Sequence, residues 1–195
     1  MLPLLYIVRH GETDWNFEGR LQGQADTDIN ERGRIQADRN GRRLAEVVTD
    51  PASFDFVASP LRRTCETMER IRAKLGLPPA GYRTDPRLKE VHFGAWQGLT
   101  YAELEERSPG CTQARTRNKW RFVPPGPDAE SYELMALRIR SWLDEITRPT
   151  ICVTHGGVIR TIFYWLENMP GDEAAALDIP QDRILRVQDG RLEWF

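Results

Sequence analysis

Two of the chain's three histidines each follow a short apolar run and precede a glycine. His10 ends the stretch "LLYIVRH", and His155 ends the stretch "TICVTH". Such runs are typical of strands buried in a parallel sheet, and ligands bind beyond the carboxyl ends of these strands. Histidine is also the commonest acid–base side chain in enzymes. We therefore expect both histidines at one site, where they could transfer protons.

A third apolar run, "FDFVAS", leads into Ser59 and a predicted helix that carries Arg62. The free N–H groups and the positive dipole end of a helix N-terminus favour an anion. Arg9 and His10 would point to opposite faces of a regular strand, but Gly11 lets the chain turn there. These strand ends are expected to bring arginines, histidines and a helix N-terminus together as an anion site.

Each of these residues taken alone has a more ordinary interpretation. A single histidine at a strand end is usually structural, Arg62 alone is typical of a solvated helix residue, and Glu90 alone is typical of a surface carboxylate. A metal site is another alternative, but His10, His155 and the carboxylates lack the close i, i+4 spacing of helical metal ligands. Only the joint occurrence of these residues favours a functional site, and no metal is predicted.

The elements that must position these residues alternate between strands and helices. Strands are expected at 4–8, 54–59 and 150–154, and a hairpin is expected around Asp189-Gly190. This alternation predicts an α/β fold, specifically a three-layer αβα sandwich. Its central sheet should be mainly parallel, with helices on both faces and an antiparallel edge strand.

The helices are predicted from caps and from apolar spacing. Asn30 and Ser59 can each cap a helix, the second of which should end at Gly76, and Thr100 opens a capping box. A further helix is expected in "VIRTIFYWLEN". The stretch 76–98 should be irregular apart from an extended piece at 87–91. The predicted inner face of the Asn30 helix is Ile35, Ala37, Leu44 and Val48, and a later helical stripe is Met135, Ile139, Trp142 and Ile146.

Composition limits the classes of protein that the chain can belong to. Its 195 residues fit one domain over residues 1–195, and a net charge of -2 argues against nucleic-acid or anionic-membrane partners. The three cysteines, Cys65, Cys111 and Cys152, are far apart and odd in number, which favours free thiols in a reducing compartment. No apolar run approaches the roughly 18 residues of a membrane span, and "MLPLLYIV" lacks the features of a signal peptide. We therefore expect a cytoplasmic protein.

Four stretches of the sequence resemble, in order, the signatures of the histidine phosphatase superfamily, also called the phosphoglycerate mutase-like family. They are "RHGETDWN", "SPLRRTCET", "LKEVHFGAWQG" and "THGGVIR". One such motif is weakly specific, but four in the right order span essentially the whole chain. The resemblance implies phosphoryl transfer through a covalent phosphohistidine, with no metal and no other cofactor.

The resemblance also implies a role for individual residues. His10 matches the nucleophile, whose other ring nitrogen binds a backbone carbonyl. Glu90 matches the acid that protonates the leaving oxygen and later activates water. Arg9, Arg62 and His155 match the cationic pocket for the phosphoryl oxygens, and neighbouring cations would also disfavour protonation of His10. The full set of predicted substrate-binding residues is Arg9, Asn16, Gln22, Gly23, Arg62, Glu90, His155 and Gly156.

The superfamily contains both phosphatases and mutases, and the variable segments favour a phosphatase. Tyr101 stands where phosphoglycerate mutases carry a lysine, and the stretch between Glu90 and His155 is short for the mutase insertion. The preferred prediction is hydrolysis of a small phosphate ester. A cofactor-dependent phosphoglycerate mutase and a non-catalytic phospholigand-binding module are the alternatives.

Several features of the sequence are left open. The polar stretch 107–130 is expected to be a loop that covers the substrate, and four of its cations could bind an anionic substrate. Glu12 is placed in a supporting ion pair, and His92 either lines the pocket or packs beside it. The positions of Glu130 and Ser131, the physiological substrate and the oligomeric state are not predicted. The four cations are Arg115, Arg117, Lys119 and Arg121.

Overall fold

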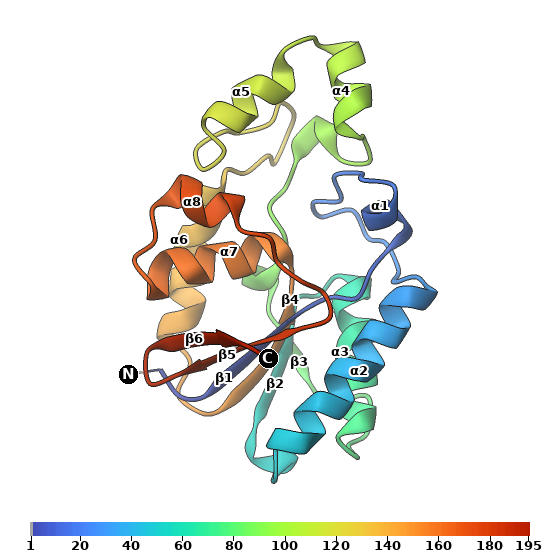
Figure 1. Cartoon of the computed structure of the whole chain (residues 1–195), viewed down its shortest axis with the longest axis vertical. Coiled ribbons are helices and arrows are strands. Elements are labelled where there is room, and N and C mark those ends of the chain that lie inside the picture. Colours follow the sequence, from blue (N-terminus) through green and yellow to red (C-terminus); the bar gives the residue numbers. More distant parts are fainter. Residues whose placement is uncertain (1) are drawn as a thin grey trace.

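A six-stranded sheet forms the centre of the computed structural model, which describes residues 2–195 (Figure 1). The strands lie in the order β3-β2-β4-β1-β5-β6. The four strands from β3 to β1 run parallel, whereas β5 and β6 are antiparallel and form the predicted hairpin. The strands are β1 (Leu5–Arg9), β2 (Asp55–Ala58), β3 (Arg83–Thr84), β4 (Thr150–Thr154), β5 (Ile184–Gln188) and β6 (Arg191–Trp194). This confirms the predicted α/β class with an antiparallel edge.

Helices cover both faces of the sheet, with α2 and α3 on one side and α6, α7 and α8 on the other (Figure 1). The α-helices are α1 (Asp14–Phe17), α2 (Glu31–Val47), α3 (Arg62–Lys74), α4 (Tyr101–Arg107), α5 (Cys111–Arg117), α6 (Tyr132–Asp144), α7 (Gly156–Leu166) and α8 (Gly171–Ala176). Single turns of 3-10 helix are η1 (Pro51–Ser53), η2 (Pro86–Leu88) and η3 (Gly94–Trp96). Within residues 2–195, none of these helices has the length and apolar character needed to span a membrane.

The alternation of side chains in β1 explains why the sheet has helices on both faces. Leu5 and Ile7 belong to the larger apolar cluster, together with residues of α6 and α7. Tyr6 and Val8 belong to a second cluster, together with residues of α2 and α3. Because successive strand side chains point to opposite faces, β1 is buried from both sides and its carboxyl end is held rigidly. That end carries Arg9 and His10.

The ends of several predicted elements differ from the sequence-based expectation. The helix expected from Ser59 begins at Arg62 with Leu61 as its N-cap, and Gly76 ends it in a left-handed conformation with φ 75°. Ile35, predicted on the inner face of α2, is 60% exposed, whereas Ala37 and Leu44 are buried as expected.

The irregular stretch 76–98 and the C-terminal part also differ from the expectation. The extended piece lies at Arg83–Thr84 in β3, and the stretch predicted as extended overlaps the single turn η2. The short helix α8 was not predicted from the sequence.

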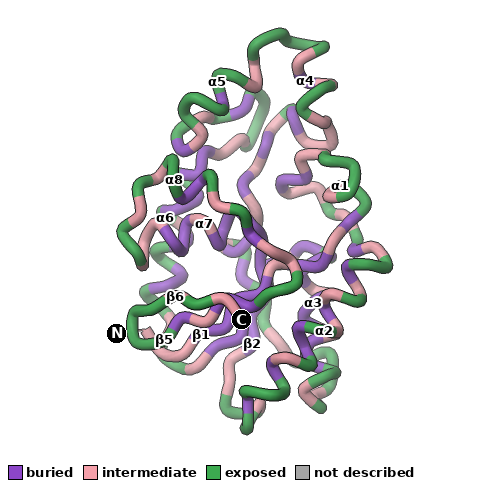
Figure 2. Tube along the Cα trace, viewed as in Figure 1, coloured by how far each residue is buried: buried purple, intermediate pink, exposed green. Residues whose placement is uncertain are grey.

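Two short helices, α4 and α5, extend beyond the carboxyl edge of the sheet, at the top of Figure 1. Thr100 caps α4 through the predicted capping box with Glu103. The next helix, α5, lies inside the stretch 107–130 that was expected to be a loop, and Figure 2 shows that both helices are largely exposed. The part of this stretch that faces the rest of the molecule includes Arg115 and Trp120, which are both buried.

Candidate active site

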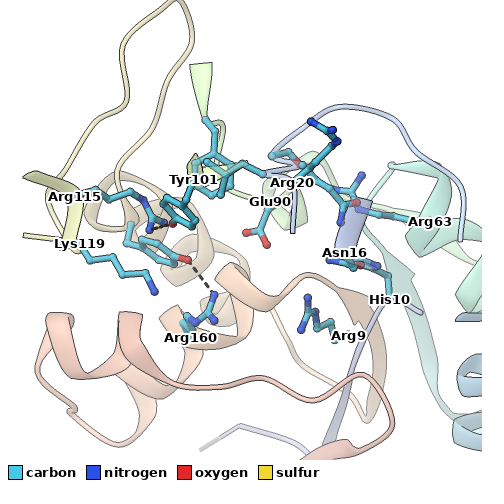
Figure 3. A pocket seen from close by; sticks show the side chains of 15 residues that line it. Arg9, His10, Asn16, Arg20, Arg63, Glu90, Tyr101, Arg115, Lys119 and Arg160 are labelled. Carbon is cyan, nitrogen blue, oxygen red and sulfur yellow. Dashed lines mark hydrogen bonds between the residues drawn. The ribbon is translucent and has the colours of Figure 1, made fainter. Parts of the chain in front are cut away.

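A cavity of about 210 Å³ opens at the carboxyl end of β1, between the sheet and the α4–α5 segment. Figure 3 shows its side chains in two groups, with Glu90 between them. Figure 3 places Arg9, His10, Asn16 and Arg63 at the inner end of the cavity, and Gln22 and Gly23 also line the cavity. The outer end is formed by Tyr101, Arg115, Lys119 and Arg160, and the hydroxyl of Tyr132 binds Arg160.

His10 lies at the inner end with its imidazole fixed by the backbone. Its side chain is 3% exposed, and Nδ1 lies 2.8 Å from the carbonyl oxygen of Gly11. Because a carbonyl can only accept a hydrogen bond, the proton resides on Nδ1 and Nε2 keeps its lone pair. Burial holds the pKa of His10 well below the usual value, and the positive charges of Arg63 and Arg9 lower it further. The ring is therefore neutral at neutral pH, with a free lone pair on Nε2.

Glycine is required at position 11 for close packing, and not for the turn that the sequence suggested. A side-chain carbon at Gly11 would lie 2.3 Å from the carbonyl oxygen of Gly33 in α2. The backbones of the two glycines are therefore in direct contact, and only glycine fits. Gly11 anchors the segment after β1 against α2, and it is not among the residues with positive φ.

Two guanidinium groups flank His10, one from the partly buried Arg9 and one from the buried Arg63. Arg9 donates from Nη1 to the carbonyl of Ile179 at 2.6 Å. Arg63 is fully buried and donates from Nη1 and Nη2 to the carbonyls of Ala25 and Gly23, each at 2.7 Å. Burial lowers the pKa of Arg63 to about 10, so the side chain stays positive at neutral pH. In the described residues, the buried Nε atoms of Arg9 and Arg63 have no hydrogen-bond partner.

The second of these arginines is not the predicted one. Arg62, which we expected in the pocket, points to solvent with 66% of its side chain exposed and pairs with Asp28 at 2.8 Å. The prediction was wrong because neighbouring helix residues point about 100° apart, and in α3 it is Arg63 that lies on the buried face. Helical spacing could have identified Arg63 as the buried arginine, because it shares a face with Thr67 and Ile71, which are both buried.

Exchanging each arginine of this pair for alanine tests the assignment directly. Arg63→Ala is expected to lower kcat/KM for a phosphate ester by about 100-fold or more, because it removes a preorganised positive charge from the site. Arg62→Ala is the matched control and should change kcat/KM by less than about threefold, since it loses only an exposed ion pair. Steady-state kinetics and thermal unfolding of both variants, with Arg63→Lys as a milder exchange, provide the measurement. Equal losses for the two alanine variants would contradict the assignment.

His155 lies against His10, with the two ring centres 5.2 Å apart. It is the N-cap residue of α7, and its Nε2 lies 2.8 Å from the hydroxyl of Ser59. The ring is fully buried, and across residues 2–195 its Nδ1 has no hydrogen-bond partner. Burial, followed by the charge of Arg63, lowers the pKa of His155 well below its usual value. The structure thus favours a neutral His155, whereas the motif predicts a cationic one.

Glu90 is held over the cavity by two backbone N–H groups. Oε1 accepts a hydrogen bond from Val91 at 2.9 Å, and Oε2 accepts one from Gly157 at 3.0 Å. A side-chain carbon at Gly157 would lie 2.0 Å from Glu90 Oε1. The first turn of α7 therefore needs glycine at position 157 for the carboxylate to occupy this place.

The remaining predicted substrate-binding residues divide into two groups. Asn16, Gln22 and Gly23 line the cavity. Asn16 also completes a capping box with Thr13, which fixes its side chain. Gly156 is not a lining residue but is buried behind the Arg9 guanidinium, where a side-chain carbon would lie 3.5 Å from Arg9 Nε.

The residues that the sequence left open lie outside the cavity. His92 accepts a hydrogen bond from the Gly94 backbone N–H through Nδ1. Glu130 binds Arg138, and Ser131 caps α6. Glu12 accepts a hydrogen bond from Asn30 and pairs with Arg32 at 3.4 Å, which confirms the supporting ion pair.

Sequence reasoning missed part of the outer end of the cavity. Of the four cations in 107–130 that could bind an anion, Arg115 and Lys119 line the cavity. Arg117 is exposed on α5, and Arg121 pairs with Glu133. Arg160 and Tyr132 were not predicted, although Arg160 lies within the quoted "THGGVIR". Its spacing of four residues after Gly156 would have placed it on the site-facing side of α7.

Comparisons with known proteins agree with this geometry. The model of the histidine phosphatase superfamily (branch 1) matches residues 5–193. A glucosyl-3-phosphoglycerate phosphatase from Mycobacterium tuberculosis is 37% identical over 177 residues, which cover 85% of this chain and 76% of the relative. A metal-independent phosphoserine phosphatase from Arabidopsis thaliana is 37% identical over 164 residues, covering 82% of this chain and 66% of that protein. A phosphoglycerate mutase is also among the relatives.

A solved structure extends the likeness to the fold. The mycobacterial glucosyl-3-phosphoglycerate phosphatase in complex with VO3 superposes with a TM-score of 0.81 at 30% identity. The superposition covers 99% of this chain and 96% of that one. The match of the family model over nearly all of the sequence, together with these relatives, shows that the chain belongs to the histidine phosphatase superfamily (branch 1).

Proposed function

We propose that this protein is a metal-independent phosphomonoesterase that hydrolyses a small phosphate ester through a phosphohistidine at His10. The observation that carries the proposal is the state of the His10 ring. It is neutral, its Nδ1 is tied to Gly11, and its other nitrogen is at a cavity flanked by two arginines. A neutral imidazole beside fixed positive charge is what nucleophilic attack on a phosphate requires.

The first half-reaction transfers the phosphoryl group to the enzyme. His10 Nε2 attacks phosphorus, the N–P bond forms, and the bond to the ester oxygen breaks. Glu90, in its protonated form, gives its proton to the leaving oxygen, so that an alcohol departs. The charge that spreads over the phosphoryl oxygens is stabilised by Arg9 and Arg63, whose guanidinium groups are already held in place by backbone carbonyls.

The second half-reaction restores the enzyme. Water attacks phosphorus, and the N–P bond breaks. Glu90, which is now a carboxylate, takes a proton from the attacking water. Inorganic phosphate leaves, and the His10 ring is again neutral, with Nδ1–H donating to the carbonyl oxygen of Gly11. Glu90 ends the cycle protonated, ready for the next ester.

Phosphoryl transfer depends mainly on positioning and on charge stabilisation, which kinases obtain from metal ions. In this proposal, Arg9 and Arg63 supply that charge, so the scheme contains no metal step and no other cofactor. The name of the metal-independent phosphoserine phosphatase among the relatives supports this part of the proposal.

A screen for phosphate release tests the function. Sugar phosphates, phosphoglycerates, nucleotides and phosphoserine are incubated with the protein and a metal chelator, and inorganic phosphate is measured. We expect release from at least one small ester at a rate that the chelator does not change. Isomerisation of phosphoglycerates that is faster than phosphate release, after priming with bisphosphoglycerate, would show a mutase instead. Neither release nor labelling of the protein would show a binding module.

A further inference from the structure

Three cations at the outer end of the cavity form no ion pair with a described residue, although the charges of Glu90 and Asp178 act on Arg160 from a greater distance. Arg115, Lys119 and Arg160 line the cavity, and within residues 2–195 none has a carboxylate oxygen within 4.0 Å. Arg20, at the rim of the same cavity, shows the usual arrangement, since it pairs with Glu18 at 2.6 Å and Glu103 at 2.8 Å. Partly buried cations are costly unless an anion compensates them.

Neutral groups hold two of the three cations in place. Arg115 is 7% exposed, donates from Nη1 to the Tyr101 hydroxyl at 2.6 Å and lies over the ring of Phe93. Arg160 donates to the hydroxyl of Tyr132 at 3.1 Å. These contacts fix the orientation of both guanidinium groups without neutralising them, which preorganises them for an anion.

Lys119, the third cation, likewise has no ion-pair partner among the described residues. Burial, and after it the positive charges of Arg160 and Arg115, lower the pKa of Lys119 to about 8. An anion bound between these side chains would remove that repulsion and favour the charged lysine.

The two ends of the cavity lie on opposite sides of Glu90 (Figure 3). Arg115 and Lys119 lie at the far end from His10 and Arg63, and Arg160 reaches in from α7. If the phosphoryl group lies beside His10 and Glu90 protonates the ester oxygen, the rest of the substrate extends toward the outer end.

We propose that Arg115, Lys119 and Arg160 form a second anion site, which selects phosphate esters whose leaving group carries a carboxylate or a second phosphate. The role of this site in turnover rests on the proposed function, whereas its ability to bind an anion does not. Tyr101 and Tyr132 support it by holding Arg115 and Arg160. The specificity of the enzyme would then come from α5 and the start of α6 and α7, outside the phosphoryl-binding end.

Three matched esters test whether the second site prefers a carboxylate, a second phosphate or an uncharged leaving group. Glycerol 3-phosphate has an uncharged leaving group, 3-phosphoglycerate adds a carboxylate, and fructose 1,6-bisphosphate adds a second phosphate. We expect kcat/KM for at least one charged member to exceed that for glycerol 3-phosphate by about tenfold or more, the usual scale of one charge-assisted contact. The charged ester that gains most identifies the anion.

Variants locate the effect. Lys119→Gln and Arg115→Gln are expected to lower the ratio of kcat/KM values, charged over uncharged ester, by about tenfold, mainly through KM. Arg117→Gln removes a positive charge from the same helix at an exposed position, so it should keep the wild-type ratio. A ratio near one in the wild type, or the same ratio in all variants, would overturn the second anion site.

The pH dependence provides an independent readout. Lys119 faces Arg115 of α5 and Arg160 of α7, and the cavity there is also lined by Tyr101 and Tyr132. Since Lys119 is charged below its lowered pKa of about 8 and neutral above it, the preference for the charged ester should fall as pH rises past about 8. In Lys119→Gln this fall should disappear.

Binding to an inactive variant separates this proposal from the proposed function. Calorimetry with His10→Asn measures the Kd of 3-phosphoglycerate, fructose 1,6-bisphosphate and glycerol 3-phosphate without turnover. If no ester is hydrolysed but a charged ester still binds about tenfold more tightly, the phosphatase fails and the anion site stands. If esters are hydrolysed but all three bind equally, the anion site fails alone.

Discussion

Replacing His10 with alanine is expected to abolish phosphate release, with a loss of kcat on the order of 10⁴-fold or more, as for other enzymes that lose their nucleophile. The reason is structural. His10 places an unprotonated ring nitrogen at the inner end of the cavity, and its other nitrogen is already bonded to Gly11. Labelling from a radioactive phosphate ester should yield a phosphoprotein in the wild type that is lost in acid and stable in base, as expected for phosphohistidine. The variant should carry no label.

His92→Ala is the control for this experiment. His92 is the remaining histidine of the chain, lies outside the cavity lining and accepts a hydrogen bond from Gly94. Its variant should label and turn over at rates within a few-fold of the wild type. Undiminished turnover in His10→Ala, or a label that moves to another residue, would rule out His10 as the nucleophile.

The inner end of the cavity could be predicted from sequence to a large extent. Apolar runs that end at Arg9 and at His155 identify strand ends, and strand ends of a parallel sheet meet at one edge. The choice between Arg62 and Arg63 could not be made in that way. It depends on the rotational phase of α3, because neighbouring helix residues point about 100° apart and only the packed fold shows that Arg63 is buried and Arg62 exposed.

The outer end of the cavity was harder to predict because tertiary contacts build it. The stretch 107–130 is polar and predicts a loop, yet α5 forms there and buries Arg115 against Tyr101 and Phe93. Tyr132 and Arg160 come from two helices, of which the first was predicted from an apolar stripe and the second as a largely buried helix. The spacing of Arg160 from Gly156 indicates its side of α7, but nothing local in the sequence indicates that Arg115, Tyr132 and Arg160 meet around one cavity.

The position of the Glu90 carboxylate also depends on a tertiary contact that the sequence does not predict. The motif predicts an acid at Glu90, but what holds its carboxylate is the backbone N–H of Gly157, 67 positions further along the chain. From the sequence, Gly157 is predicted only to lie near the start of a helix. Only the fold shows that its missing side chain provides the space for Glu90 Oε1.

Replacing Glu90 with glutamine should have the second largest effect, a loss of about 10²- to 10⁴-fold in kcat, as expected when a general acid is removed. The loss should depend on the leaving group. An alkyl phosphate needs a proton on its departing oxygen, whereas p-nitrophenolate leaves readily as an anion, so p-nitrophenyl phosphate should lose less in the first half-reaction. Single-turnover labelling with the two esters measures that step apart from hydrolysis of the phosphohistidine. Equal losses with both esters would contradict the role of Glu90 as acid.

Gly157→Ala tests the same carboxylate without changing it. The added carbon would lie 2.0 Å from Glu90 Oε1, so the side chain must move away from its place over the cavity. If Glu90 is the acid, Gly157→Ala should reproduce the leaving-group dependence of Glu90→Gln, lowering the single-turnover labelling rate for the alkyl ester more than for p-nitrophenyl phosphate. A merely structural disturbance would lower both rates alike and would also lower the melting temperature, which separates the two explanations. Because the two variants share no altered residue, agreement between them would assign the effect to the position of the Glu90 carboxylate.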